Sequence, residues 1–206
     1  MQMEKYSHIY KYYEKCFAKH GDSHLGVDWP NLPELQVRFN VMLGLIDMNE
    51  DASVLDFGCG NGLLYDYLNV QNIQNISYMG LDISNRFINF CREKYPDATF
   101  YCLDINKEDL TLDFDYAICN GVFTEKLDLT FSEMFSFFSE TISTLFKSAN
   151  KGIAFNVMST HVDYEREDLF HLPHDLLAEF ITKNLSRKYV IRNDYGLYEY
   201  SVYIYK

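Results

Sequence analysis

The stretch Val54-Leu55-Asp56-Phe57-Gly58-Cys59-Gly60-Asn61-Gly62 decides how this chain folds. An apolar run ends in the acid Asp56, three glycines follow at every second position, and a helical pattern occupies residues 63–68. Glycine permits positive φ angles and a close approach of a ligand to the backbone. The free N–H groups at a helix start bind anionic or acceptor-rich ligand groups. The stretch therefore predicts a strand, a ligand-binding turn and a helix.

Length and composition indicate one folded α/β domain. The 206 residues suffice for a single core, so we expect one domain over 1–206, with a helical cap and lid in 1–50 and a Rossmann-like core in 51–206. Apolar residues make up 48% of the chain and aromatic residues 17%, which argues against extensive disorder. The aromatic surplus fits a core or a pocket for a flat ring.

Charge and cysteine content exclude several classes of function. The net charge of −12 argues against a nucleic-acid partner, because neutralising phosphates takes a basic surface. The five cysteines are scattered without a C-x-x-C pair, so we expect reduced thiols in a cytoplasmic protein and no metal site. No apolar run approaches the ~20 residues that span a bilayer, so we expect no membrane insertion and no signal peptide.

Two helices are expected before the core. The first ends at Gly21, a loop follows over 21–33, and Pro33 starts the second helix. The apolar positions at helical spacing are Ile9, Tyr12, Tyr13, Cys16 and Phe17 in the first helix and Leu35, Phe39, Met42 and Ile46 in the second. These helices are an addition to the α/β core.

From residue 53 onward, predicted strands and helices alternate, which indicates parallel strands. Strands are expected at 54–57, 77–81, 99–103, 114–120 and 153–158. Helices are expected at 84–95, after the capping pair Thr130 and Glu133, and at 173–183. The residues of the second of these helices that are expected to face the core are Phe131, Met134, Phe135, Phe138, Ile142 and Leu145. A short loop joins 188–192 to 199–205, so that pair is antiparallel. The prediction is an α/β, Rossmann-like, mostly parallel seven-stranded sheet with a C-terminal antiparallel hairpin and two extra N-terminal helices.

Acids stand at the ends of three consecutive predicted strands: Asp56, Asp82 and Asp104. Ligands in open α/β sheets bind outside the carboxyl ends of the strands, so we expect these carboxylates to share one site. Asp82 is placed to accept hydrogen bonds from both hydroxyls of a ribose, which fits NAD equally well. The alternatives are a helix-capping role for Asp82 and a solvated loop acid at Asp104.

The acid followed by Gly58-Cys59-Gly60-Asn61-Gly62 resembles motif I of the class I S-adenosylmethionine-dependent methyltransferases. A dinucleotide-binding loop has its third glycine one residue later. The parallel strands closed by a hairpin are also similar to that family's sheet. The resemblance implies that S-adenosylmethionine is the cofactor, with its positive methionine end near Asp56, its ribose on Asp82 and its adenine amino group on Asp104. It further implies cofactor contacts from Phe57, Gly58, Cys59, Gly60, Ile83 and Ile105.

The end of the fourth predicted strand resembles the family's substrate-facing motif. The resemblance implies that Asn120 and Gly121 meet the methionine end of the cofactor or an acceptor hydroxyl, and that Phe123 lines the transfer channel. The D/N-P-P-Y/F motif of amino-group methyltransferases is absent, which disfavours N-methylation of bases or amides.

The carboxylate of S-adenosylmethionine needs a cation that the glycine loop lacks. Arg38, supported by Gln36, is the candidate, and a surface arginine is the alternative. Trp29, in the preceding loop, is expected either to form part of a lid over the cofactor or to anchor that loop to the core.

The acceptor side is expected to include the loop after the fifth strand and the hairpin. His161 is the candidate general base for a hydroxyl acceptor, because an unperturbed imidazole titrates near neutrality; the alternative is a surface histidine. The residues expected to face the acceptor are His20, His24, Tyr164 and Tyr195. Positioning and desolvation supply most of the rate of methyl transfer, so a base is not required.

Segments 26–29, 152–159 and 194–206 are similar to a group of small bacterial methyltransferases whose relatives are associated with surface-polysaccharide or other small-molecule biosynthesis. We therefore expect O-methylation of a small sugar-like or phosphorylated metabolite by a monomer or homodimer. Two alternatives stay open. An NAD-dependent oxidoreductase is disfavoured by the early third glycine and the hairpin, and a non-catalytic S-adenosylmethionine-binding protein by the intact loop and acids.

Overall fold

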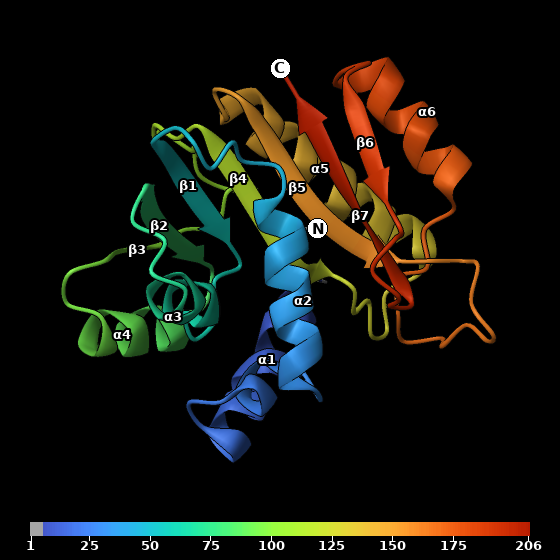
Figure 1. Ribbon diagram of the computed structural model, residues 1–206. Coiled ribbons are helices and arrows are strands. Elements are labelled where there is room, and N and C mark those ends of the chain that lie inside the picture. Colours follow the sequence, from blue (N-terminus) through green and yellow to red (C-terminus); the bar gives the residue numbers. More distant parts are fainter. Residues whose placement is uncertain (1–5) are drawn as a thin grey trace.

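A seven-stranded sheet organises the computed structural model, which describes residues 6–206 (Figure 1). The strand order is β3-β2-β1-β4-β5-β7-β6. Strands β1 to β5 run parallel, and β7 pairs antiparallel with both β5 and β6. The strands are β1 (Ala52–Phe57), β2 (Ile76–Asp82), β3 (Thr99–Cys102), β4 (Tyr116–Phe123), β5 (Gly152–Met158), β6 (Tyr189–Arg192) and β7 (Glu199–Tyr205). The predicted Rossmann-like sheet with an antiparallel hairpin is confirmed.

Helices cover both faces of this sheet. In Figure 1, α2 lies in front of the sheet and α5 behind it. The helices are α1 (Ser7–His20), the 3₁₀ helix η1 (His24–Val27), α2 (Leu32–Leu43), α3 (Leu63–Val70), α4 (Asn85–Lys94), α5 (Phe131–Ser148) and α6 (His174–Asn184). Both N-terminal helices are present, although the loop between them contains η1 and α2 begins one residue before Pro33. None of the described helices is both long and apolar enough to cross a bilayer.

Alternation along the strands builds two cores, one on each face. In β1, Val54 belongs to the cluster that contains residues of α2, α3 and α4, whereas its neighbour Leu55 belongs to the cluster that contains residues of α5 and α6. In β4, Ile118 belongs to the first core and Ala117 to the second. Both faces of the sheet are therefore buried, and a ligand is left with access at the ends of the strands.

The capping signals mark helix starts as predicted. Ser84 Oγ accepts a hydrogen bond from Phe87 N (3.4 Å) at the start of α4, and Thr130 forms a capping box with Glu133 at the start of α5. The expectation that Phe131 faces the core is wrong. Its side chain is 39% exposed at the first position of α5, where it stacks against Phe135.

The carboxyl ends of the central strands point toward α1 and η1. In Figure 1 the arrowheads of β1 and β2 face the lower part of the view, where these two helices lie. β4 continues beyond its predicted end at Asn120, because Phe123 pairs with Val157 of β5 after an irregularity in the register. The site therefore lies between the ends of the strands and the N-terminal helices.

Candidate active site

A cavity opens where β1 to β4 end, beneath α1. Its enclosed volume is about 150 Å³, and it is open to solvent at its mouth. The predicted site residues that line it are Trp29, Asp56, Phe57, Gly58, Cys59, Gly60, Asp82, Ile83, Asp104, Ile105, Asn120 and Gly121. The fold thus brings the glycine loop and the three strand-end acids to one place.

The glycine loop lets side chains from other segments approach its backbone. Gly58 (φ 74°) and Gly60 (φ 53°) adopt left-handed conformations that residues with a side chain rarely take. A Cβ atom at Gly58 would lie 2.6 Å from Val122 Cγ2, and one at Gly60 would lie 2.8 Å from Val27 Cγ1. Val122 and Val27 both line the cavity, so these glycines set how closely its walls approach.

Asp56 is a buried carboxyl at the end of β1. It is 4% exposed, and Tyr78 Oη donates a hydrogen bond to its Oδ2 (2.8 Å). Burial raises the pKa of Asp56 to about 7, and the Tyr78 hydrogen bond opposes that rise only in part. A positively charged ligand group in the cavity would therefore stabilise the ionised form.

Asp82 joins the end of β2 to the glycine loop. Gly60 N donates to its Oδ2 (3.0 Å), and Ser84 N donates to its Oδ1 (2.8 Å). Burial raises the pKa of Asp82 to about 6, and these two N–H groups oppose the rise. Each carboxylate oxygen retains a second lone pair, so Asp82 is still able to accept from ligand hydroxyls.

Asp104 follows β3 and is covered by the first turn of α1. Tyr6 Oη donates to Asp104 Oδ2 (2.5 Å), and Asn106 N donates to Oδ1 (3.2 Å). The Tyr6 ring stacks on Phe137 of α5, with centroids 5.1 Å apart. Tyr6 therefore links α1 to the acid and to the opposite wall of the cavity.

Arg38 lies behind the cavity wall, in contact with Trp29. It is buried, and its Nε donates to both carboxylate oxygens of Glu199 (3.0 and 2.9 Å). Its Cζ atom lies 4.3 Å from the ring centroid of Trp29, which lines the cavity. The alternative of a surface arginine is wrong. Glu199 was not foreseen, although an acid at the start of an apolar strand is a signal for a buried ion pair.

Several predicted site residues do not line the cavity. Gln36 is exposed on α2, and Phe123 is fully buried in the core next to Phe138. His161 is exposed, with its ring 5.3 Å from that of His174. The residues expected to face the acceptor, His20, His24, Tyr164 and Tyr195, are also outside the lining.

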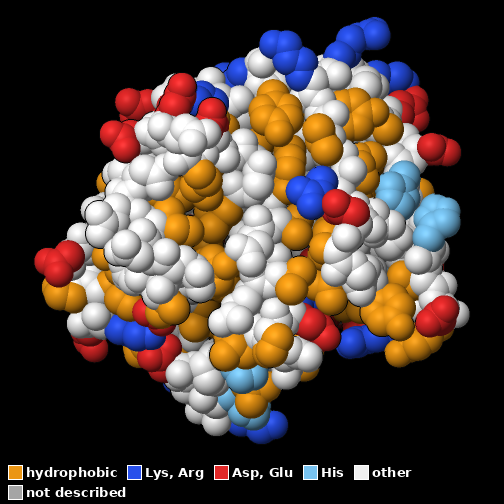
Figure 2. Space-filling view, viewed as in Figure 1, with side chains coloured by type: hydrophobic (Ala, Val, Ile, Leu, Met, Phe, Trp, Pro, Cys, Tyr) orange, Lys and Arg blue, Asp and Glu red, His pale blue; other side chains and the backbone are white. Residues whose placement is uncertain are grey.

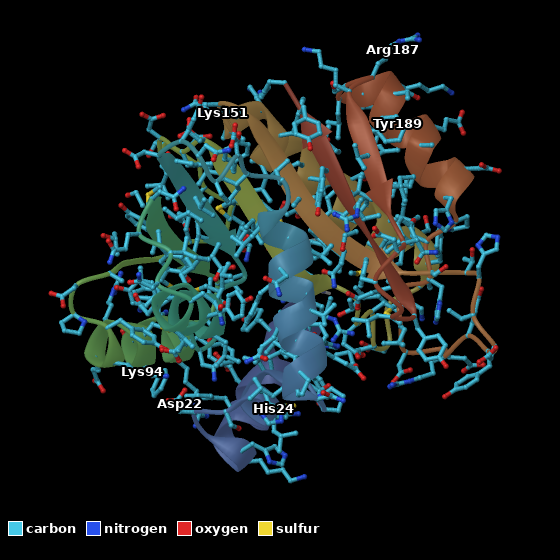
Figure 3. All side chains as sticks on the ribbon, viewed as in Figure 1. Asp22, His24, Lys94, Lys151, Arg187 and Tyr189 are labelled. Carbon is cyan, nitrogen blue, oxygen red and sulfur yellow. The ribbon has the colours of Figure 1, made fainter. Side chains whose placement is uncertain are left out.

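The positions of these residues explain why they do not line the cavity. Figure 3 labels His24 at the lower tip of the molecule, on η1. Tyr164 is 75% exposed, and Tyr195 Oη is engaged with Ser201 Oγ at 2.9 Å. The expectation of His161 as a base at the site therefore has no geometric support, and the same holds for the acceptor-facing set.

A family model described as a methyltransferase domain matches residues 48–186, more than half of the chain. The chain belongs to this methyltransferase family. Over 168 residues, 79% of this chain and 98% of the relative, this methyltransferase is 26% identical to a candidate methyltransferase of Mycobacterium tuberculosis.

Solved methyltransferases share its fold. The plantazolicin methyltransferase BpumL, solved with S-adenosylhomocysteine, matches with a TM-score of 0.66 at 16% identity, covering 100% of this chain and 94% of that one. Magnesium protoporphyrin IX methyltransferase from Synechocystis PCC 6803, solved with S-adenosylmethionine, matches with a TM-score of 0.62 at 16% identity and the same coverage. The predicted family, fold and enzyme class are confirmed, and the cofactor is S-adenosylmethionine.

The lining of this methyltransferase fits that cofactor. Asn61 Oδ1 and Asn120 Oδ1 are buried without a hydrogen-bond partner among the described residues, and both residues line the cavity. A buried acceptor without a partner is costly, so a ligand donor such as an ammonium group would satisfy it. With the carboxyls of Asp56 and Asp82, the methyltransferase offers acceptors to a ligand rich in donors and positive charge.

Most of the residues that cover the cavity from the side of α1 were not predicted from the sequence. Ile9, Tyr10 and Tyr13 of α1 line the cavity together with Tyr6, the residue just before this helix. Their helical spacing is visible in the sequence, but such a stripe is as typical of a core-facing helix as of a ligand-facing one. The methyltransferase thus has an aromatic roof opposite its acids.

None of the lining residues in the described part of the chain is Lys, Arg or His, and the cation next to the lining acids is Lys107, whose Nζ lies 3.1 Å from Asp104 Oδ2. Figure 2 instead shows several Lys and Arg side chains at the upper end of the molecule, where Figure 3 labels Lys151 and Arg187. This distribution bears on the acceptor, because phosphates and carboxylates are usually held by cations.

Proposed function

We propose that this methyltransferase transfers the methyl group of S-adenosylmethionine to a hydroxyl of a small, uncharged, sugar-like acceptor. The observation that carries the proposal is the cavity lining, with acids on one side, an aromatic roof on the other and no cation among the described lining residues. Aromatic faces pack against the apolar C–H faces of sugar rings, whereas a phosphorylated acceptor would find no cation among the described lining residues and would be repelled by ionised acids. Of the two acceptor types expected from the sequence, the uncharged one is therefore supported.

The residues around the cavity hold the cofactor in this proposal. When bound, S-adenosylmethionine supplies a methyl group on a positively charged sulfur. Asp56 favours the positive end, Asn120 Oδ1 accepts from its ammonium group, and Asp82 accepts from the ribose hydroxyls. Asp104 accepts from the adenine amino group, next to the hydroxyl of Tyr6.

The roof residues act on the acceptor by positioning and by excluding water. Tyr10, Tyr13 and Trp29 all line the cavity. Orienting two reactants and removing water from around them account for a large share of the rate of such a displacement. His161 lies outside the cavity, and we assign it no role in the transfer.

Label transfer from S-adenosylmethionine with a radioactive methyl group tests the acceptor. The panel consists of matched pairs, each an uncharged sugar-like alcohol and its phosphate ester. We expect label to enter members of the uncharged set, and to enter more slowly at subsaturating cofactor with Asp82→Asn, which loses a carboxylate oxygen at the cofactor site. Preferential labelling of the phosphate esters would contradict the acceptor class while leaving the methyltransferase activity intact.

A further inference from the structure

A ring of buried contacts links the C-terminal strand to the cavity wall. Glu199, the first residue of β7, is 1% exposed. Both of its carboxylate oxygens accept from Arg38 Nε (3.0 and 2.9 Å), and Oε1 also accepts from Asn156 Nδ2 (2.9 Å). Glu199 therefore holds together one residue of α2 and one of β5.

Glu199 is linked to Trp29 through Arg38, and we call this series of contacts the first branch. The guanidinium of Arg38 lies over the indole ring, 4.3 Å from its centroid. The indole packs on the backbone of Gly121, because a Cβ atom there would lie 2.5 Å from Trp29 Cζ2. This branch therefore places the side chain that walls the cavity beside the end of β4.

The second branch leads to the same glycine from the opposite side. Asn156 is fully buried, and its Oδ1 accepts from Gly121 N (2.8 Å). Gly121 has φ 80°, and the preceding residue, Asn120, carries the buried amide oxygen that lacks a partner. The two branches thus meet at the turn that presents Asn120 to the cavity.

Stability alone is a poor explanation for this arrangement. Burial raises the pKa of Glu199, and Arg38 and Asn156 oppose that rise. The free energy needed to remove both charges from water offsets much of the attraction between them. Proteins in which apolar residues replace a buried ion pair are often at least as stable. What the pair provides beyond stability is a fixed geometry for its two branches.

We propose that Glu199 is a positioning residue for methyl transfer, which fixes Trp29 through Arg38 and the Asn120–Gly121 turn through Asn156. The proposal rests on the proposed function in one respect: the wall it fixes is taken to be the one that faces the methyl group. Glu199 touches neither cofactor nor acceptor in this account and acts only through these neighbours.

Trp29 is the single tryptophan of the chain, so tryptophan fluorescence reports directly on the surroundings of its indole. In Glu199→Gln, we expect the emission maximum to move to longer wavelength and acrylamide quenching to increase, because Arg38 no longer holds the indole. Calorimetric titration with S-adenosylhomocysteine should show affinity weakened by about tenfold, the effect of losing about one hydrogen bond when the Asn120–Gly121 turn is no longer held in place.

Asp115→Asn is the matched control. Asp115 is a partly buried carboxylate at the opposite ends of the strands, where it accepts from Ser53 N (3.1 Å) and lies 3.8 Å from Lys151 Nζ. This variant should lose some stability and leave both Trp29 emission and S-adenosylhomocysteine affinity as in the wild type. Comparison of Asp115→Asn with Glu199→Gln therefore distinguishes a general loss of stability from a change in the position of Trp29.

The double variant Arg38→Met with Glu199→Gln removes both charges and leaves neither unpaired. We expect its melting temperature to return toward that of the wild type while Trp29 emission and affinity stay altered. Recovery of emission and affinity together with stability would overturn the proposal, as would a Glu199→Gln protein that behaves like Asp115→Asn. If the wild type binds no S-adenosylhomocysteine, the proposed function fails. The emission data would then still test whether Glu199 fixes the position of Trp29.

Discussion

Asp56 is a carboxyl whose protonated form the fold of the free protein favours up to about pH 7. Its pKa is raised to about 7 by burial, from an ordinary value of about 4 in the unfolded chain. The folded state therefore binds the proton more tightly than the unfolded state does. The resulting contribution to stability is complete below about pH 4 and is lost as the pH rises through 7.

Asp56→Asn should remove this pH dependence and keep the hydrogen bond from Tyr78. We expect the free energy of unfolding of the variant, relative to wild type, to increase between pH 5 and pH 8 by on the order of 1–3 kcal/mol. Urea denaturation at both pH values measures it, with the exposed Asp109→Asn as control. An equal difference at pH 5 and pH 8 would show that Asp56 does not titrate in this range.

Gly121 and Gly196 form a matched pair of left-handed glycines, with φ 80° and 74°. A Cβ atom at Gly121 would collide with Trp29, whereas one at Gly196 would meet nothing within 4 Å. We expect Gly121→Ala to lower the free energy of unfolding by about 1–3 kcal/mol more than Gly196→Ala does, because only the first is overpacked. Denaturant unfolding of both proteins decides this, and equal losses would mean that Trp29 moves aside freely.

At the scale of elements, α1 crosses the carboxyl edge of the sheet. Its Tyr6 reaches Asp104 after β3, and its Glu14 accepts from Ser84 Oγ (2.5 Å) after β2. The sequence predicted the helix and its end at Gly21. It did not predict which surface the aromatic face covers, because the spacing of side chains in a helix carries no information about its partner.

Two helix caps separate stability from cofactor binding. Thr130 caps α5 and is not among the cavity-lining residues, whereas Ser84 caps α4 and its N–H donates to the lining acid Asp82. Each change to Ala should lower the free energy of unfolding by about 1 kcal/mol, the usual cost of losing a cap. Only Ser84→Ala should also weaken binding of S-adenosylhomocysteine, because it releases Glu14 of α1. Calorimetry on both variants checks this, and equal affinities would contradict a role for that contact.

At the scale of the whole molecule, the sequence predicted which acids would meet. Parallel strands end at one edge, so Asp56, Asp82 and Asp104 were expected together without knowledge of any long-range contact. The structure does not bring His161 and Tyr164 to the cavity lining, because following a strand does not determine where a loop then turns. Both lie on the segment after β5, which runs outside the cavity lining.

Contacts between distant parts of the chain were beyond prediction from a single sequence. Arg38 and Glu199 are separated by 161 positions, and nothing in the local pattern of either pairs them. The same is true of Asn156, a polar residue within the apolar strand β5. These long-range contacts arise from packing of α2 and β7 against the sheet, which local propensity does not encode.

The most direct test of the central claim is calorimetric titration of the folded protein with S-adenosylhomocysteine, in the wild type and in Asp82→Asn. If the strand-end acids and the glycine loop form the cofactor site, the wild type binds one equivalent saturably. Asp82→Asn then binds at least about tenfold more weakly, as expected when a buried polar contact is lost. A folded wild-type protein that shows no binding, or an Asp82→Asn protein that binds as tightly as wild type, would contradict the account.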